Sequence, residues 1–290
     1  GVLANATGAQ GKYNIVVGTD AGEDLATGYS NVLVGDSAGK ELTDGQDNIA
    51  IGAFALDAAN AGEHYNIAIG TNTLGAETSG ADGCIAIGHH ALLAQNRAES
   101  GNTAVGFEAG KAIPATSGGR YSVIMGYSAA IAAMTGDANT IIGYASGQAM
   151  LGGASNTLLG YASGQDLTTG TSNTFIGTSA GLNATTGKEN VAIGQDAMGL
   201  GVTANASSTQ GMYNVAIGSG AGYDLTSGQS NILLGKDAGA NFTDNTDNVA
   251  IGKGALDGCN GGENFNVAIG SYALSADIAG SDYCVAIGSY

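Results

Sequence analysis

The stretch Asn48-Ile49-Ala50-Ile51-Gly52 is one of sixteen copies of the same five-residue phrase in a chain of 290 residues. The phrase runs asparagine, an apolar residue or Thr, usually a small or apolar residue, a large apolar residue and glycine; Asn66–Gly70 and Asn248–Gly252 are two further clean copies. The closing glycines are 17 or 18 residues apart, except for one interval of 20 and one of 24. A fixed period of this size predicts a stacked-repeat architecture.

Each phrase has the pattern of a short β-strand. Side chains alternate between the two faces of a strand, so Ile49 and Ile51 share one face while Asn48 and Ala50 share the other. The closing Gly52 is expected to end the strand in a turn that needs positive φ. Thr-Gly and Ser-Gly pairs between the phrases are typical of turns. We therefore predict an all-β fold, a parallel β-solenoid of about sixteen coils of 17–18 residues.

Both strand faces are apolar, and the sequence does not decide which one is internal. One face forms a ladder of large aliphatic residues, and we assign the phrase to the repeat core through Asn48, Ile49, Ile51, Gly52, Asn66, Ile67, Ile69, Gly70, Asn248, Ile251 and Gly252. A single coil is thin and buries only one face, so the other would remain as a long apolar strip, which marks an interface. The positions assigned to that interface are Ala50, Ala68, Ala86, Phe175, Ala250 and Ala268.

A second, longer period encloses the coils. Residues 201–290 repeat residues 1–90 with about half of the positions identical, at an offset of 200. We expect residues 1–290 to form one continuous solenoid, in which the block 1–200 begins to repeat at 201–290. Because the chain opens in a loop and stops two residues after a closing glycine, we also expect it to be a window of a longer polypeptide.

Composition excludes several classes of function. The formal net charge is −17, with 8 basic against 25 acidic residues, so there is no basic stripe for nucleic acid and no attraction to anionic lipid. No apolar run of about 18 residues predicts a membrane span, so we expect no membrane insertion. Gly is abundant, at 51 residues, but it follows turns rather than a collagen period. The three cysteines are too few for a disulfide framework.

Few residues suggest bound ions or catalysis. Asp44, Asp47, Asp244 and Asp247 recur in oxygen-rich loops that can hold Ca²⁺, the alternative being aspartates that cap turns. His89 and His90 would point to opposite faces of an extended segment and chelate poorly, and His64 is isolated. Cys84 and Cys284 replace the phrase asparagine, either as small buried residues or as a cluster where chains meet. No catalytic triad or carboxylate cleft stands out, so we expect no enzyme and no cofactor.

The repeat resembles two known families of fibrous protein. The phrase Asn-Val-Ala-Ile-Gly followed by two residues and Ala, as in Asn248–Ala255, resembles the head repeat of YadA-like trimeric autotransporter adhesins. The longer unit, seen in Asn248–Leu256 and Leu167–Asn173, is similar to the repeats of bacteriophage tail fibres, cyanophage ones included. The resemblance implies a left-handed β-roll, three identical chains around a central axis and attachment to a surface. The coils here are longer than those of the adhesins, which favours the phage-type fibre.

We therefore expect a structural shaft segment of an extracellular appendage, either a phage tail fibre or a similar filament. The alternatives are a YadA-like cell-surface adhesin head and a tail-spike polysaccharide depolymerase whose carboxylates are assembled between chains. The expected partners are further copies of the chain, as a homotrimer that could continue end to end, and a host glycan or protein receptor. The expected location is extracellular or on a virion surface.

Overall fold

The computed structural model describes residues 12–58, 62–75, 81–95, 101–114, 118–200, 211–276 and 280–290. The chain divides into two compact units, Gly1–Ile142 and Gly143–Tyr290. Each unit is a parallel β-solenoid, which confirms the predicted fold class, and the described residues contain no helix. The first eleven residues and their counterparts at 201–210, which belong to the sequence repeat, lie outside the described residues.

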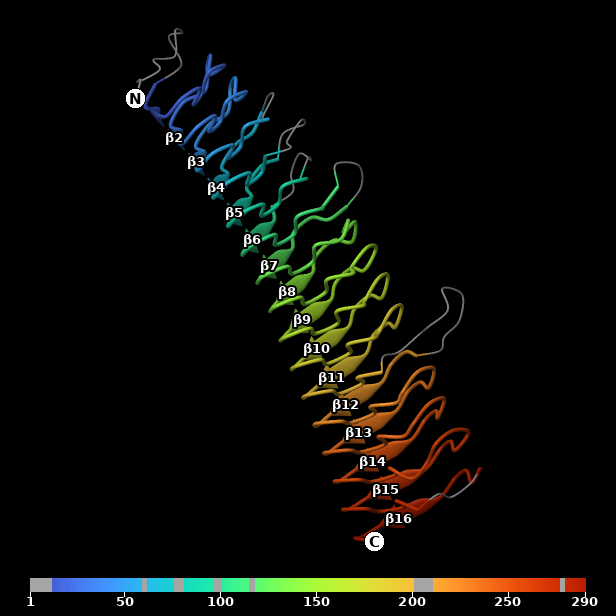
Figure 1. Ribbon diagram of the computed structural model, residues 1–290. Coiled ribbons are helices and arrows are strands. Elements are labelled where there is room, and N and C mark those ends of the chain that lie inside the picture. Colours follow the sequence, from blue (N-terminus) through green and yellow to red (C-terminus); the bar gives the residue numbers. More distant parts are fainter. Residues whose placement is uncertain are drawn as a thin grey trace. The chain divides into compact units, whose positions relative to one another are not determined.

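Every strand is three residues long and coincides with the middle of one phrase (Figure 1). The first unit contains β1 Ile15–Val17, β2 Val32–Val34, β3 Ile49–Ile51, β4 Ile67–Ile69, β5 Ile85–Ile87, β6 Thr103–Val105, β7 Val123–Met125 and β8 Thr140–Ile142. The second unit contains β9 Thr157–Leu159, β10 Thr174–Ile176, β11 Val191–Ile193, β12 Val215–Ile217, β13 Ile232–Leu234, β14 Val249–Ile251, β15 Val267–Ile269 and β16 Val285–Ile287.

Within each unit, consecutive strands pair in parallel and in an unbroken register. Ala50 of β3 pairs with Leu33 of β2 on one side and with Ala68 of β4 on the other. The register survives the two long coils: Ala104 pairs with Ile124 across the interval of 20 residues, and the interval of 24 leaves β11 and β12 paired in the same way. Equivalent residues of successive coils therefore form columns along each unit.

The closing glycines form one such column, and they are required there. Gly52 has φ of +136°, and a Cβ added to it would lie 2.5 Å from the carbonyl oxygen of Gly70 in the next coil. No side chain fits at that distance, so the backbone of one coil packs directly on the backbone of the next. The expectation of positive φ at this position is confirmed.

The middle residue of each strand points into the coil, and the two flanking residues point outward. Ala50, Leu33 and Phe175 have no exposed surface, whereas Ile51 is 38% exposed and Ile49 is half-buried. The six positions assigned to an interface between chains, Ala50, Ala68, Ala86, Phe175, Ala250 and Ala268, are all fully buried inside their own chain. That assignment was wrong, and Ile49 and Ile51 are not core residues, because the coil closes over its small residues.

The interior of the coil is filled by exchanging volume between two positions. Where the strand centre is Ala50, the fourth residue after the closing glycine is the buried Leu56; where the centre is Phe175, that residue is Gly181. A Cβ on Gly181 would lie 2.5 Å from the Phe175 ring. A large residue at one position therefore excludes a large residue at the other, as close packing of a core requires.

The phrase asparagines form a buried amide ladder. The Oδ1 atom of Asn190 accepts hydrogen bonds from the backbone N–H of Asn214 at 3.0 Å and from the Asn214 side chain at 3.1 Å. The Asn190 Nδ2 atom donates to the carbonyl oxygen of Gly211 at 2.8 Å. Because one side chain ties its coil to the next and its strand to the returning segment, asparagine satisfies buried backbone groups that an apolar residue would leave unpaired.

Candidate functional site

The outward-facing residues of the strands form an aliphatic sheet face on each unit, called here the outer face. Its members are the first and third residue of every strand, all of which are Val, Ile, Leu, Met or Thr. Ile232 is 42% exposed, Leu159 42% and Val17 45%. Large aliphatic side chains in adjacent columns, without a charged residue among them, make a continuous apolar surface, which on soluble proteins marks an interaction site.

The aspartates considered for Ca²⁺ serve as links between coils. Asp44 Oδ1 accepts a hydrogen bond from the Gly62 backbone at 2.8 Å, and Asp244 Oδ1 accepts one from Gly262 at 3.0 Å. Asp47 and Asp247 hold the left-handed residue before the phrase asparagine, with φ of 55° and 57°. Among the described residues, no group of three or more His, Cys, Asp and Glu side chains is placed to hold a metal ion. The structure thus favours the turn-capping interpretation of Asp44 and Asp244.

The two adjacent histidines lie together rather than on opposite faces. Their ring centroids are 3.7 Å apart because they occupy a turn, in which His90 has φ of 58°. The expectation of an extended segment was wrong here. His89 stacks on Phe107, and His90 Nδ1 lies 3.7 Å from Glu108 Oε1. Burial, followed by the neighbouring His89, lowers the pKa of His90. His64 Nδ1 accepts a hydrogen bond from the Gln46 backbone at 3.1 Å.

The cysteines at the asparagine position continue the ladder only in part. Cys84 is fully buried, and its backbone N–H donates to Asn66 Oδ1 at 2.9 Å. Cys284 is half-buried, with its sulfur 3.8 Å from the carbonyl oxygen of Asp282. Both side chains belong to the inner side of the coil, so a small buried residue describes Cys84 better than a member of a cluster between chains.

One charged residue inside the second unit was not singled out by the sequence. Glu263 is 2% exposed, and its Oε1 atom accepts a hydrogen bond from Gly280 N while Oε2 accepts from Gly261 N and Asn245 Nδ2. Burial alone would raise the pKa of Glu263, but these hydrogen bonds together lower it. Glu263 therefore acts as a charged brace for the returning segments, and its placement among glycines and asparagine was the available signal.

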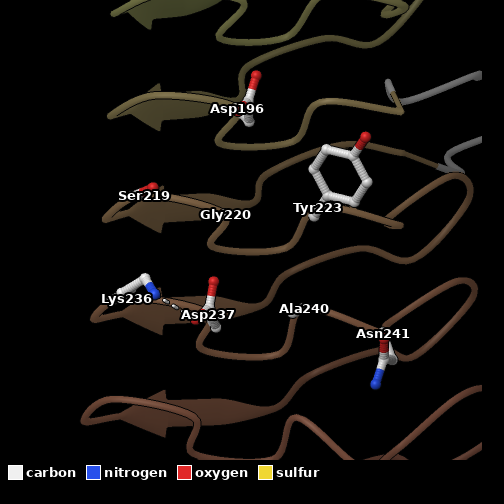
Figure 2. Close-up of a pocket in the computed structure, with 8 residues that line it drawn as sticks. All are labelled: Asp196, Ser219, Gly220, Tyr223, Lys236, Asp237, Ala240 and Asn241. Carbon is white, nitrogen blue, oxygen red and sulfur yellow. Dashed lines mark ion pairs between the residues drawn. The ribbon is translucent and has the colours of Figure 1, made fainter.

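A polar hollow of about 420 Å³, called here the polar hollow, opens on the second unit (Figure 2). It spans three successive coils, on the turns that follow β11, β12 and β13. Its lining combines two carboxylates, one ammonium group, one aromatic ring and small residues: Asp196, Ser219, Gly220, Tyr223, Lys236, Asp237, Ala240 and Asn241.

The hollow has an aromatic wall and a charged side. Tyr223 is 40% exposed, and its ring covers Gly199, where an added Cβ would lie 2.6 Å from the ring. On the other side, Lys236 Nζ lies 3.3 Å from Asp237 Oδ2, as Figure 2 shows. The sequence did not predict this site, because it depends on residues about 17 positions apart that only the stacking of coils brings together.

Comparison with known proteins does not identify a family. No family model matches the chain, and no curated protein matches it. Within the described ranges, no helix is long and apolar enough to cross a lipid bilayer. The fold and its repeats define the chain as a parallel β-solenoid with tandem repeats of about 17 residues.

Proposed function

We propose that this chain is a structural shaft segment of an extracellular, multi-chain attachment fibre, of which a phage tail fibre is the representative type. The observation that carries the proposal is the outer face. In each unit it extends over eight strands with two aliphatic or Thr residues per strand, and nothing within the described part of its own chain is printed as pairing with it. Burial of such a face is the main favourable term in association.

The size of the outer face suits an interface between chains. Eight strands about 4.8 Å apart, each three residues of about 3.3 Å, give a face of roughly 380 Å² on each unit. The two units together offer about 760 Å², close to the roughly 800 Å² that each partner contributes to a standard protein interface. Association through this face would therefore be of ordinary strength without further contacts.

The spacing of the outer face favours a second copy of the chain as its occupant. Apolar side chains recur on it at the interval between strands, in two unbroken columns per unit. A partner that fills the grooves along the whole face must repeat at the same interval, which a second copy does. The resemblance to tail-fibre and adhesin repeats supports three copies around an axis, with an extracellular or virion location.

The assembly is tested by changing the two strand faces separately. The paired substitutions Ile51→Asp and Ile69→Asp place charges on the outer face, and we expect a folded chain that sediments as a monomer. The matched variant Ala50→Asp places the charge in the closed interior, where the side chain has no exposed surface, and we expect loss of the fold itself. Circular dichroism reports the fold and sedimentation velocity reports the assembly. A parent chain that is a stable, folded monomer would refute the proposal.

Two other functions compete with a shaft. A cell-surface adhesin head is supported by the phrase Asn248–Ala255, and immunolabelling of virions and of cells distinguishes the two locations. A polysaccharide depolymerase would need carboxylates assembled between chains. Incubation of the assembled protein with host capsule or lipopolysaccharide tests this role, and release of new reducing ends would overturn the structural assignment.

A further inference from the structure

We infer that the polar hollow of the second unit binds a neutral sugar unit of a surface glycan. This inference rests on the proposed attachment function and deepens it by naming a site and a ligand class. The hollow measures about 420 Å³, within the range of small-molecule sites, and it is open to solvent along the turns of three coils (Figure 2).

The groups lining the hollow match the chemistry of a pyranose ring. Asp196 and Asp237 supply carboxylate oxygens that accept hydrogen bonds from sugar hydroxyls, and charged acceptors make stronger hydrogen bonds than neutral ones. The Asn241 NH₂ group donates to the Asp257 backbone, so its amide oxygen is the end that can accept from a ligand. The Tyr223 ring offers an apolar surface for the C–H face of the sugar.

Charge separates neutral sugars from other ligands. The hollow holds two carboxylates against a single ammonium group, and Lys236 is already paired with Asp237 at 3.3 Å. Phosphate, sulfate and the acidic sugars would meet a net negative site, which disfavours them. The lining also lacks the aliphatic residues that apolar ligands need. A hydroxyl-rich, uncharged ligand is the class that remains compatible with the site.

The block repeat provides a closed version of the same surface. At the offset of 200, Gly220 corresponds to Asp20, Tyr223 to Glu23 and Ala240 to Lys40. In the first unit Lys40 Nζ lies 3.4 Å from Glu23 Oε2. The coil framework is the same in the two places, so an ion pair and an added carboxylate occupy the positions that hold an aromatic ring and two small residues in the second unit.

Gly220 contributes to the hollow by lacking a side chain. A Cβ added there would lie 2.6 Å from Asp237 Oδ1, so the glycine leaves this carboxylate its place. The equivalent Asp20 has φ of 48°, and Gly220 has φ of 66°. Because aspartate already adopts this backbone conformation in the first unit, Gly220→Asp is expected to fold while it fills the site.

The inference is tested on the 290-residue chain by saturation-transfer NMR. The probes are the methyl glycosides of glucose, mannose and galactose, with N-acetylneuraminic acid and spermidine as charged comparisons. We expect transfer to at least one neutral glycoside and none to the charged probes. The triple variant Gly220→Asp, Tyr223→Glu, Ala240→Lys installs the closed surface of the first block, and we expect it to weaken binding at least tenfold.

The control variant is Tyr161→Ala, which removes an exposed tyrosine outside the hollow and should leave binding unchanged. Absence of transfer to every neutral glycoside would overturn the inference, as would binding of the charged probes alone or equal binding by the triple variant. Sedimentation of the same samples separates the two proposals. An assembled chain that binds no sugar contradicts only the sugar site, whereas a monomeric chain contradicts the multi-chain fibre whatever it binds.

Discussion

The exchange of volume inside the coil can be tested by moving it from one coil to another. Phe175 is fully buried, and Gly181 lies beneath its ring. The double variant Phe175→Ala, Gly181→Leu recreates in this coil the pair formed by Ala250 and Leu256 in the same unit. Leu256 has φ of 53°, close to the 59° of Gly181, so leucine can adopt the backbone that the change requires.

The single and double changes should differ sharply in free energy of unfolding. Phe175→Ala alone leaves a cavity and should cost about 3–5 kcal/mol. Gly181→Leu alone forces a side chain into the ring, where even its Cβ would be 2.5 Å away, and should cost about 1–3 kcal/mol. The double variant restores the volume, so we expect it to lie within about 2 kcal/mol of the parent chain. The two changes are therefore coupled by at least about 2 kcal/mol.

Chemical denaturation followed by far-UV circular dichroism measures the four chains of this double-mutant cycle. All four should be compared in the same assembly state, because association adds to apparent stability. A double variant as unstable as the sum of its two single variants would refute the packing account. It would show that the strand centre and the residue after the turn are not neighbours in one core.

Three further changes test other features of the coil. Gly52→Ala should lower the free energy of unfolding by about 3 kcal/mol or more through its clash with the next coil, whereas Gly62→Ala, with nothing within 4 Å, should cost about 1 kcal/mol, as melting temperatures will show. Burial raises the pKa of Asp57 to about 6, so stability should fall by about 1 kcal/mol as pH rises from about 4 through 6, and Asp57→Asn should remove this slope in a pH series of melting curves. Asn190→Ala should cost about 2–4 kcal/mol and speed amide exchange at Asn214, whose N–H loses its acceptor.

The pKa of Asp57 sets the sign of that pH dependence. Its carboxyl binds a proton more tightly in the folded chain than in the unfolded chain, so protonation favours folding below about pH 6. The side chain is only partly buried, and solvent screening reduces the full effect of the shift. A flat profile in the parent chain, or the same slope in the asparagine variant, would contradict this explanation.

Much of the fold follows from the spacing of the phrases. The closing glycines and asparagines located every strand, because each is required by contacts with the next coil rather than by local preference. The inner and outer faces could not be assigned from one phrase alone, since both are apolar. The missing signal was the relation between Ala50 and Leu56, or between Phe175 and Gly181, which identifies the strand centre as part of a shared interior.

The candidate site was harder to predict than the fold. The polar hollow is created by Gly220 and by the short side chain of Ala240, and a sequence pattern draws attention to chemical groups rather than to missing ones. Asp44 and Asp244 drew attention as possible metal ligands, although they accept backbone hydrogen bonds between coils. Comparison of the two blocks at the offset of 200 would have indicated where Tyr223 departs from the common framework.

The constant strand register has a consequence for how such a chain can change. Coils of 17 and of 24 residues present the same three strand residues to their neighbours, as β10 with β11 and β11 with β12 demonstrate. The number of residues in a coil is therefore independent of its pitch. New peptide segments placed between Leu200 and Gly211 should alter the surface without disturbing the stack, so the solenoid can acquire recognition sequences by insertion while its length is set by counting strands.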